Sequence, residues 1–382
     1  MTSRLQRLGS AAALLTVAAC LGGPAQQATG PGVPVDTPTA SGGALAARPQ
    51  AVSFVSATTG WVLADGPCGA VRCAVVLRTR DGGRGWQPVT APGTVVGRAA
   101  RPKRGVSRVV FASDRDGWAF GPELYATHDG GTSWRRVDIG EVLDLSVSSG
   151  VAYAAVAGCA GSTASAGSAS SCTPASAVLS TAAGKDDWRA LGRLTLPTGA
   201  QPVVLAEPGA TYVLDTAPLT GQLSVWKGAA WQQQSTPCSD PAGGTFGVAL
   251  GAWRSTGLVL ACAGSRPNGQ YANPTHASTD GAGTWRDLAD VPASGRPASV
   301  AAVDASTYFV ALLGDHSGIA VTRNGGRSWA PVLATPTEAA DGFRYVAFAD
   351  ATHGVAISGP QTNAVFITTD AGRTWRRQPF AT

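Results

Sequence analysis

The sequence predicts an all-β protein, a seven-bladed β-propeller of four-stranded antiparallel blades with Asp-box turns. Two observations carry the prediction: a short motif that ends in tryptophan recurs seven times, and successive tryptophans of the motif are 43 to 54 residues apart. This interval is the length of a four-stranded propeller blade and is too long for a leucine-rich repeat. A third observation excludes helical repeats, because no segment keeps a helical period of apolar residues.

Five copies of the motif are clear, among them RTRDGGRGWQPV, which is the first, and ITTDAGRTWRRQ, which is the last. A serine or threonine stands seven positions before the tryptophan in all seven copies, and an Asp or Asn stands five positions before it in these five. Two weaker copies, centred on Trp188 and Trp231, have Ala183 and Trp226 in the acid position. The residues of the five clear boxes are Asp81, Asp129, Asp280, Asn324 and Asp370, with Trp86, Trp134, Trp285, Trp329 and Trp375.

We interpret this box as a structural turn. An Asp or Asn side chain in a tight turn accepts hydrogen bonds from backbone N–H groups a few residues on, glycine supplies positive φ, and tryptophan covers the hairpin with a large ring. The alternative is a ring of carboxylates that binds Ca²⁺ or substrate, which requires several oxygens at one point, whereas these acids are distributed one to a blade. His128 lies inside one box, where we expect a solvated side chain.

The segments before the boxes predict the other strands of each blade. In FVSATTGWVLA, FASDRDGWAFG and FADATHGVAIS, a phenylalanine stands six residues before a glycine that begins an apolar strand. Each unit then has an inner strand, a second strand, a third strand that runs into the box, and a fourth strand that begins at the tryptophan. Trp61 and Trp118 head second strands at equivalent positions, and we expect both to pack in the core.

These repeats resemble BNR/Asp-box repeats over about residues 50–382. The pattern is similar to the seven-bladed propellers of the photosystem II stability/assembly factor-like proteins and of sortilin-type Vps10 domains, and more distantly to sialidases. The motif is specific for the fold and uninformative about function, because the same box occurs in enzymes, receptors and scaffolds. The assembly-factor resemblance implies a role in helping membrane or exported proteins to assemble.

The N-terminus has the layout of a bacterial lipoprotein signal. Arg4 and Arg7 precede an apolar run that is too short to span a bilayer as a helix, and the run ends in Val-Ala-Ala-Cys at Cys20. We therefore predict a signal peptide at 1–19, a lipidated Cys20 with a Pro/Gly/Thr/Ala tether at 20–48, and the propeller at 49–382. The predicted location is the extracytoplasmic face of the cell membrane. The alternative is an ordinary secretory signal with a coincidental cysteine.

The six other cysteines are an even number in a chain that is predicted to be exported, which is typical of disulfides. Neighbours in sequence give the pairs Cys68 with Cys73, Cys159 with Cys172, and Cys238 with Cys262, and other pairings remain open. If the boxes join third to fourth strands, all three pairs lie on the face opposite the boxes. No spacing of cysteine and histidine indicates zinc, and we predict no metal and no cofactor.

The densest run of charge is VVGRAARPKRGVSR, in the loop before the second blade. This loop belongs to the same face as the cysteine pairs, beside the central channel, where propellers usually bind. An acidic protein surface, anionic lipid headgroups or a polyanionic wall polymer fits such a run, and so does a merely solvated loop. Nucleic acid is not expected, because the chain is exported and lacks a basic-aromatic platform. The candidate binding residues of this face are Arg98, Arg101, Lys103, Arg104 and Arg266.

The sequence does not assemble the catalytic set of a sialidase, which combines arginines on the substrate carboxylate with a Tyr nucleophile, a Glu and an acid/base Asp. The Arg-Ile-Pro signature of that class is absent. Tyr345 follows Arg344, with Glu338 and Asp341 just upstream, but Tyr345 lies in a predicted inner strand, where we expect it in the core. We therefore predict no enzyme activity.

Together these features predict a monomeric, membrane-anchored lipoprotein that acts as a non-catalytic protein-binding or assembly-scaffold propeller. The predicted partner is an exported or membrane protein, or a cell-envelope glycan. The alternative is a carbohydrate-binding or glycoside hydrolase propeller of sialidase type. A sortilin-like ligand receptor is a further alternative, and it would require a peptide-sized channel.

Overall fold

The computed structural model describes residues 35–36, 47–68, 71–97, 104–157, 177–194, 196, 200–216, 221–238, 247–265, 271–314, 317–334, 341–359, 364–378 and 380. All of them belong to one compact unit, Gly32–Thr382. This part of the chain is built from β-strands, which confirms the predicted all-β class. It contains no helix that is long and apolar enough to cross a membrane.

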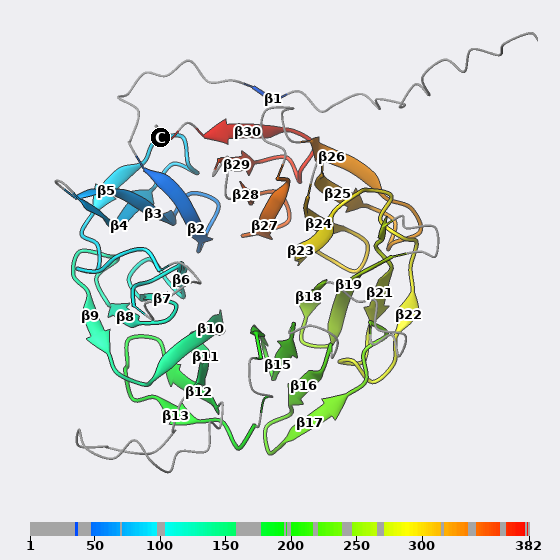
Figure 1. Ribbon diagram of the computed structural model, residues 1–382, viewed down its shortest axis with the longest axis horizontal. Helices are drawn as coiled ribbons and strands as arrows, with labels where there is room; N and C mark the ends of the chain where they lie inside the picture. Colours follow the sequence, from blue (N-terminus) through cyan, green and yellow to red (C-terminus); the bar gives the residue numbers. More distant parts are fainter. Residues whose placement is uncertain are drawn as a thin grey trace, which may run out of the picture. The chain divides into compact units, whose positions relative to one another are not determined.

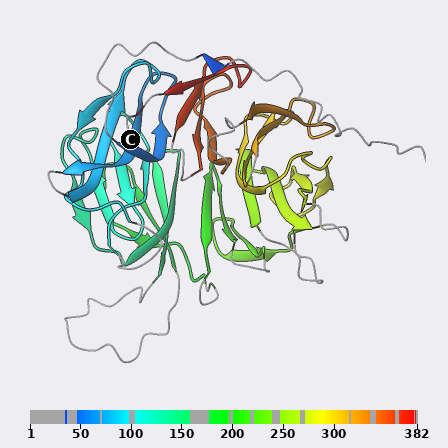
Figure 2. The ribbon, with the colours of Figure 1, turned by 45° about the horizontal axis from the view of Figure 1, so that its top comes forward.

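Seven antiparallel sheets stand around a ring in sequence order (Figure 1). In each sheet four strands run in chain order from the centre of the ring outwards, so the prediction of seven four-stranded blades is confirmed. Figure 2, in which the ring is tilted, shows the inner strands of the blades standing around the axis.

Four consecutive strands form each of the first four blades. Blade 1 comprises β2 (Arg48–Phe54), β3 (Gly60–Cys68), β4 (Val71–Thr79) and β5 (Gln87–Val89). Blade 2 comprises β6 (Arg108–Phe111), β7 (Gly117–Phe120), β8 (Leu124–Thr127) and β9 (Arg135–Val137). Blade 3 comprises β10 (Glu141–Ser148), β11 (Val151–Ala157), β12 (Ala177–Ala182) and β13 (Arg189–Ala190). Blade 4 comprises β14 (Pro202–Glu207), β15 (Ala210–Asp215), β16 (Leu223–Trp226) and β17 (Trp231–Gln234).

Blades 5 and 7 each carry one additional short strand. Blade 5 comprises β18 (Gly247–Arg254), β19 (Gly257–Ser265), β21 (Thr275–Ser278) and β22 (Arg286–Asp287), with β20 (Tyr271–Ala272) paired to β19. Blade 6 comprises β23 (Arg296–Ala302), β24 (Tyr308–Leu313), β25 (Gly318–Thr322) and β26 (Ala330–Ala334). Blade 7 comprises β27 (Phe343–Phe348), β28 (Gly354–Ser358), β29 (Val365–Thr368) and β30 (Trp375–Gln378), and β1 (Val35–Asp36) pairs with the outer side of β30.

Each clear box closes the hairpin between the third and fourth strands of its blade. In blade 1 the Thr79 hydroxyl donates to Asp81 Oδ1 at 2.8 Å and accepts from the Gly83 N–H at 2.8 Å. The Gly85 N–H donates to the same Oδ1 at 2.9 Å. Equivalent bonds occur in the boxes of blades 2, 5, 6 and 7. Each acid or amide of these boxes is therefore occupied by its own turn, in line with the structural interpretation.

The box turn is also bonded to the turn between the first and second strands of its own blade. The Gly82 N–H donates to Thr58 O at 2.9 Å in blade 1, and the Gly130 N–H donates to Arg115 O at 2.8 Å in blade 2. Corresponding bonds occur in blades 3, 5, 6 and 7. These two turns therefore share one face of the ring, which we call the box face. The connections from second to third strands and from one blade to the next lie on the opposite face, the loop face.

Blades 3 and 4 differ from the boxes that the sequence predicted. In blade 3 the acid is not lost but displaced, because Asp187 accepts the Thr181 hydroxyl at 3.0 Å. In blade 4 there is no box: Trp226 pairs directly with Trp231 across the turn 227–230. Ser224 lies inside this hairpin, opposite Gln233, and does not cap a turn. The hairpin of blade 4 is shorter than a box hairpin, but Ser224 still stands seven residues before Trp231, so the sequence matched the spacing of the box motif.

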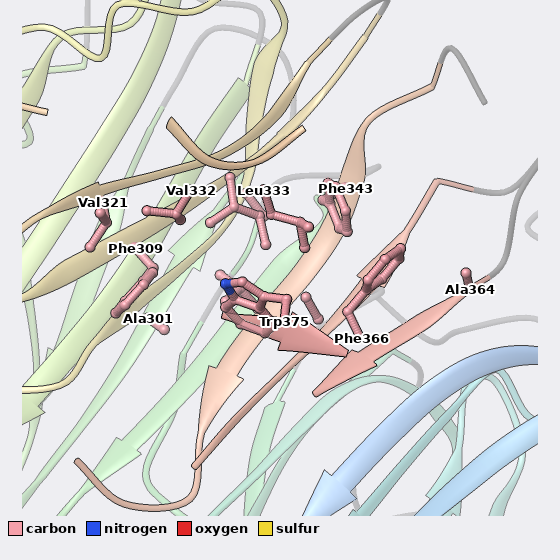
Figure 3. Close-up of a cluster of buried hydrophobic side chains, with 13 residues drawn as sticks. Ala301, Phe309, Val321, Val332, Leu333, Phe343, Ala364, Phe366 and Trp375 are labelled. Atoms are coloured by element: carbon pink, nitrogen blue, oxygen red, sulfur yellow. The ribbon is translucent and has the colours of Figure 1, made fainter. Parts of the chain in front are cut away.

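The apolar cores lie between neighbouring blades. Figure 3 shows the core between blades 6 and 7, where Phe309 of β24, Phe366 of β29 and Trp375 of β30 are buried. Trp61 and Trp118 are fully buried, as predicted. The Trp61 ring stacks on Phe111 of the next blade with 3.6 Å between ring centroids. Large rings that bridge two blades remove much apolar surface from water and hold the ring together.

The four main strands of blade 1 and of blade 7 are each contiguous in sequence, and among the described residues the one strand that crosses between the two ends is β1, which precedes blade 1 and pairs with the outer side of β30. These two blades meet through side chains, at a contact that we call the seam. Leu77 of blade 1 and Ile367 of blade 7 belong to one buried cluster. The Arg344 guanidinium of blade 7 donates to Pro49 O of blade 1 at 2.7 Å.

Gly83 tests how closely the seam is packed. Its φ is +77°, and a Cβ at this position would lie 2.0 Å from Ile367 Cδ1. We expect Gly83→Ala to lower the free energy of unfolding by about 2 kcal/mol in urea denaturation, because the left-handed backbone and the clash both oppose the methyl group. Gly93→Ala is the control, since nothing lies within 4 Å of a Cβ there. An equal loss in both variants would contradict close packing at the seam.

Candidate functional site

The candidate site is the centre of the loop face, where the inner strands begin. Four of the seven inner strands have a register shift at this end, and a β-bulge of this kind changes the direction of the neighbouring side chains. Charged and aromatic side chains are grouped beside these shifts. The shifts lie at Pro49/Ala51 in β2, Val142/Asp144 in β10, Pro297/Ser299 in β23 and Phe343/Tyr345 in β27.

An ion pair joins blades 2 and 3 at this centre. Arg108 begins β6 and bonds to Asp144 of β10, whose second oxygen accepts the Val204 N–H of blade 4 at 2.7 Å. The Asp144 side chain is 5% exposed and the Arg108 side chain is 51% exposed. Burial raises the pKa of Asp144, while Arg108 and the Val204 N–H act against this rise by stabilising the carboxylate. One carboxylate therefore ties three blades together.

Serine hydroxyls make similar links between inner strands. Ser53 of blade 1 accepts the Phe111 N–H of blade 2 at 3.0 Å, and Ser146 of blade 3 accepts the Ala206 N–H of blade 4 at 3.1 Å. An inner strand pairs with its own sheet on one side only, so its other edge carries free N–H groups. Side chains of the preceding blade satisfy part of them. The wall of the site is thus held in place by the protein itself.

Tyr345 is exposed at this centre, and the prediction that it lies in the core is wrong. Its relative exposure is 36%. It belongs to blade 7, yet charged groups of blades 2 and 3 act on its hydroxyl. Desolvation of the hydroxyl by the surrounding protein raises the pKa of Tyr345, the positive charge of Arg108 acts to lower this pKa, and the negative charge of Asp144 acts to raise it. The ring is therefore surrounded by inner strands but open to solvent. The physical reason is the bulge before it, which turns the side chain away from the contact between blades.

Two further arginines begin the inner strands of the blades on either side of blade 7. Arg48 of blade 1 and Arg296 of blade 6 each precede a proline, and both are exposed. Neither forms an ion pair within the part of the chain that the structure describes. Arg344, by contrast, is partly buried at the seam, and burial lowers its pKa to about 10 against the opposing effect of Asp341. The inner strands of blades 1 and 6 therefore each begin with an exposed guanidinium group, and the inner strand of blade 7 between these two blades carries the exposed phenol of Tyr345.

The most exposed large apolar side chains of the described residues all lie on the loop face. Val71 is 66% exposed in the β3–β4 hairpin, Val95 is 48% exposed in the connection to blade 2, and Tyr345 is the third. The Ala74 N–H donates to Thr94 O at 2.9 Å, so this hairpin and this connection lie side by side. Of the two faces, the loop face is therefore the better suited to hold another molecule.

Within the predicted basic loop, the structure describes one candidate residue, Arg104, which is exposed. At the base of this loop, Glu123 accepts the Gly105 N–H at 2.9 Å and the Thr94 hydroxyl at 2.8 Å. Burial acts to raise the pKa of Glu123, but these bonds together with Arg136 and Arg104 lower it below its usual value. The predicted residues that lie outside the described ranges are Arg98, Arg101, Lys103, Arg266, Cys20, Cys159 and Cys172.

Two disulfides support the loop face. Cys68–Cys73 closes the β3–β4 hairpin, and Cys238–Cys262 joins the connection after blade 4 to β19. Both are pairs that sequence proximity predicted. The second bridge is buried, with 3% of each cysteine exposed, whereas Cys68 is exposed.

The site offers charge, hydrogen bonds and an aromatic ring to a ligand. Asp144 is already occupied by Arg108 and a backbone N–H, which removes it as a free base beside Tyr345. Of the two acids that the sequence places upstream of Tyr345, Asp341 is described and Glu338 is not. No group of three His, Cys, Asp or Glu that could hold a metal occurs among the described residues. This arrangement is suited to recognising a ligand by charge and shape.

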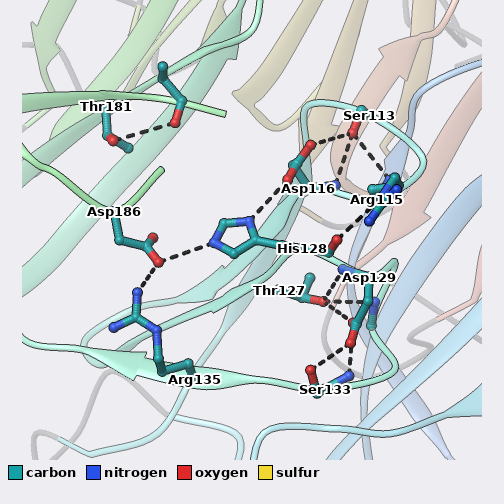
Figure 4. A network of polar contacts seen from close by, with 12 residues as sticks. Ser113, Arg115, Asp116, Thr127, His128, Asp129, Ser133, Arg135, Thr181 and Asp186 are labelled. Carbon is teal, nitrogen blue, oxygen red and sulfur yellow. Dashed lines mark hydrogen bonds and ion pairs between the residues drawn. The ribbon is translucent and has the colours of Figure 1, made fainter. Parts of the chain in front are cut away.

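His128 forms a second polar cluster, on the box face between blades 2 and 3 (Figure 4). Its Nδ1 lies 3.0 Å from Asp116 Oδ1 and its Nε2 lies 3.1 Å from Asp186 Oδ2. Asp186 also pairs with Arg135. The prediction of a merely solvated turn residue is wrong, because the ring reaches the box turn of the next blade. Burial acts to lower the pKa of His128, but the two carboxylates outweigh it and raise the pKa.

Neither Asp144 nor the two arginines that begin inner strands were among the site residues predicted from the sequence. The one available signal was the pair Arg-Pro, which occurs before an apolar strand at Arg48 and again at Arg296. Asp144 gave no local signal, because its partners belong to other blades.

The fold and the site define a seven-bladed propeller with exposed charged and aromatic side chains at the centre of its loop face. Solved structures of the same architecture include YCF48 from Cyanidioschyzon merolae, 17% identical with a TM-score of 0.56, covering 88% of this chain and 97% of that one. Another is YCF48 bound to D1 peptide, 16% identical with a TM-score of 0.55, covering 86% of this chain and 95% of that one. At such identities the likeness shows the fold. No protein-family model and no curated protein matches this sequence.

The ion pair at the centre gives a stability prediction. Arg108→Ala leaves the buried Asp144 carboxylate without its counter-charge, so we expect it to lower the free energy of unfolding at pH 7 by about 2 kcal/mol. The loss should shrink near pH 4, because a protonated Asp144 needs no counter-charge. Arg296→Ala, at an exposed arginine, should change stability by less than about 0.5 kcal/mol. Urea unfolding at the two pH values checks this, and a pH-independent loss in Arg108→Ala would contradict it.

His128 gives a pH prediction. Because its pKa is higher in the folded than in the unfolded chain, its ion pairs stabilise the fold fully below the ordinary histidine value of about 6.5 and are lost as pH rises through the folded pKa. As pH increases through the folded pKa of His128, we expect the melting temperature of the wild type to fall, and that of His128→Asn to fall less. Calorimetry across this pH range is the measurement. The same pH dependence in both proteins would refute a stabilising role for the cluster.

Proposed function

We propose that this chain is a non-catalytic binding propeller, held at the extracytoplasmic face of the cell membrane by a lipid on Cys20. In this proposal residues 1–19 are a signal peptide, residues 20–48 a lipidated tether and residues 49–382 the propeller. The partner is an exported or membrane protein that the propeller holds during assembly. The observation that carries the proposal is the exposed group at the centre of the loop face, formed by Tyr345, Arg48 and Arg296.

A peptide segment of the partner fits the chemistry of this surface. Guanidinium groups bind carboxylates and backbone carbonyls, and a phenol provides both an apolar face and a hydrogen bond. Acids of the same face are engaged internally: Asp65 pairs with Arg72 at 2.9 Å, and Asp144 pairs with Arg108. An incoming carboxylate therefore meets available positive charge. A similar propeller, YCF48, has been solved with D1 peptide bound, which supports a peptide as the kind of ligand.

The carbohydrate alternative has less support. A glycoside hydrolase places two carboxyl groups on either side of the bond that it cleaves. The carboxylate whose charge acts on the Tyr345 hydroxyl is that of Asp144, and its two oxygens are already bound to Arg108 and to a backbone N–H. A glycan bound by Tyr345 without cleavage remains the second candidate, and the experiment below separates it from a protein partner.

Photo-crosslinking in native membranes tests the proposal. A photoreactive residue replaces Arg48 or Arg296 on the loop face, and Arg373 in the blade 7 box serves as the exposed control. We expect a discrete protein adduct from the first two positions and none from the third, because only the loop face presents the site. Glycan adducts from the first two positions would favour the second candidate. Equal, diffuse labelling from all three positions would refute the loop face as the binding face.

A further inference from the structure

One described segment of the predicted tether, β1, is paired with the outermost strand of the propeller. β1 runs parallel to β30, with Val35 opposite Trp375 and Asp36 opposite Arg376. Figure 1 shows β1 along the outer side of blade 7. Among the described residues, the other six blades end at their fourth strand on this side. Blade 7 is therefore the one blade whose outer edge is occupied by a distant part of the chain.

The outer strand of blade 7 is also more buried than its counterparts. Trp375 is 1% exposed, whereas the tryptophans at the same place in the other six blades are all partly exposed. Gln378, at the end of β30, is 8% exposed, whereas Gln234, at the same place in β17, is partly exposed. The low exposure of Trp375 and Gln378 therefore agrees with an outer edge of blade 7 that is covered by β1.

The sequence around β1 favours pairing with an edge. Pro34 and Pro38 flank the paired residues. Proline keeps itself and the residue before it extended, so the segment loses less conformational entropy when it pairs. Proline also lacks an N–H and so favours a place at a sheet edge over one inside a sheet. An outer edge that is already paired is closed to unwanted strands from other chains.

We propose that residues 35–36 act as a strap that holds the outer rim of blade 7 toward the membrane. The proposal rests on the proposed lipid anchor at Cys20. Val35 lies fifteen positions after Cys20, a span of about 20 Å as a random coil and about 50 Å at full extension. A tether that is free up to the first blade would present the propeller to the membrane in any orientation. With the strap paired, one rim faces the membrane, and the loop face stays accessible to a partner.

Hydrogen exchange of the full chain tests the pairing itself. The variant carries Val35→Pro and Asp36→Pro, which remove the N–H groups that β1 donates to β30 and so detach β1, leaving the outward amides of β30 without the β1 carbonyls as acceptors. We expect the β30 amides that do not pair with β29 to exchange about tenfold faster, the effect of one or two lost hydrogen bonds. Ala40→Pro with Ser41→Pro makes the same change elsewhere in the tether and should leave exchange as in the wild type. Unchanged exchange of β30 in the first variant would overturn the strap, whatever the partner or the anchor.

Lipid labelling tests the orientation. A photoreactive residue is placed at Arg377 of β30 or at Gln233 of β17, both exposed on outer strands. The lipidated protein is then bound to vesicles of phosphatidylethanolamine and phosphatidylglycerol. We expect stronger labelling of lipid from position 377, and equal labelling from the two positions in the variant with Val35→Pro and Asp36→Pro. Equal labelling in the protein with an intact strap would overturn the orientation. A Cys20→Ser protein that still binds the vesicles would contradict the anchor rather than the strap pairing.

Discussion

Closure of the ring at a single seam is the constraint on which the rest of the structure depends. Blades 1 and 7 each keep their own four main strands, so side chains hold the two blades together at the seam, and the two-residue β1 adds a backbone pairing at the outer side of β30. Arg344 and Arg376 of blade 7 donate to backbone carbonyls of blade 1, at 2.7 Å and 2.9 Å, over a shared apolar cluster. Arg344 directly precedes Tyr345, so the residue that helps to close the ring also fixes one side of the candidate site.

The other inner strands are fixed in a comparable way. Side-chain oxygens of one blade accept N–H groups of the next, and Asp144 does so while it pairs with Arg108. These bonds satisfy edges that would otherwise be unpaired, and they set the spacing of the side chains at the centre of the loop face. A surface whose geometry is fixed in the free protein loses less entropy when a ligand binds. Structural bonds and the proposed recognition surface are therefore built from the same strands.

The features that the sequence predicted correctly are those that a short segment determines. Seven blades, their strand order, the five clear box turns and the core positions of Trp61 and Trp118 follow from local periodicity and turn chemistry. The predictions were wrong where a side chain's position depends on contacts between blades or on a β-bulge. Tyr345 turns out of the core at a bulge, and His128 is held by an acid of the next blade. The missing box of blade 4 was hidden because a shorter hairpin preserved the spacing to Trp231.

Binding of a partner at the centre of the loop face is tested most directly by hydrogen exchange, measured for the purified protein alone and for the protein together with membranes of its own cells. If a partner is held there, we expect added protection in the segments where inner strands begin, around Arg48, Arg296 and Tyr345, with the box turns unchanged. Added protection confined to the box turns would contradict it.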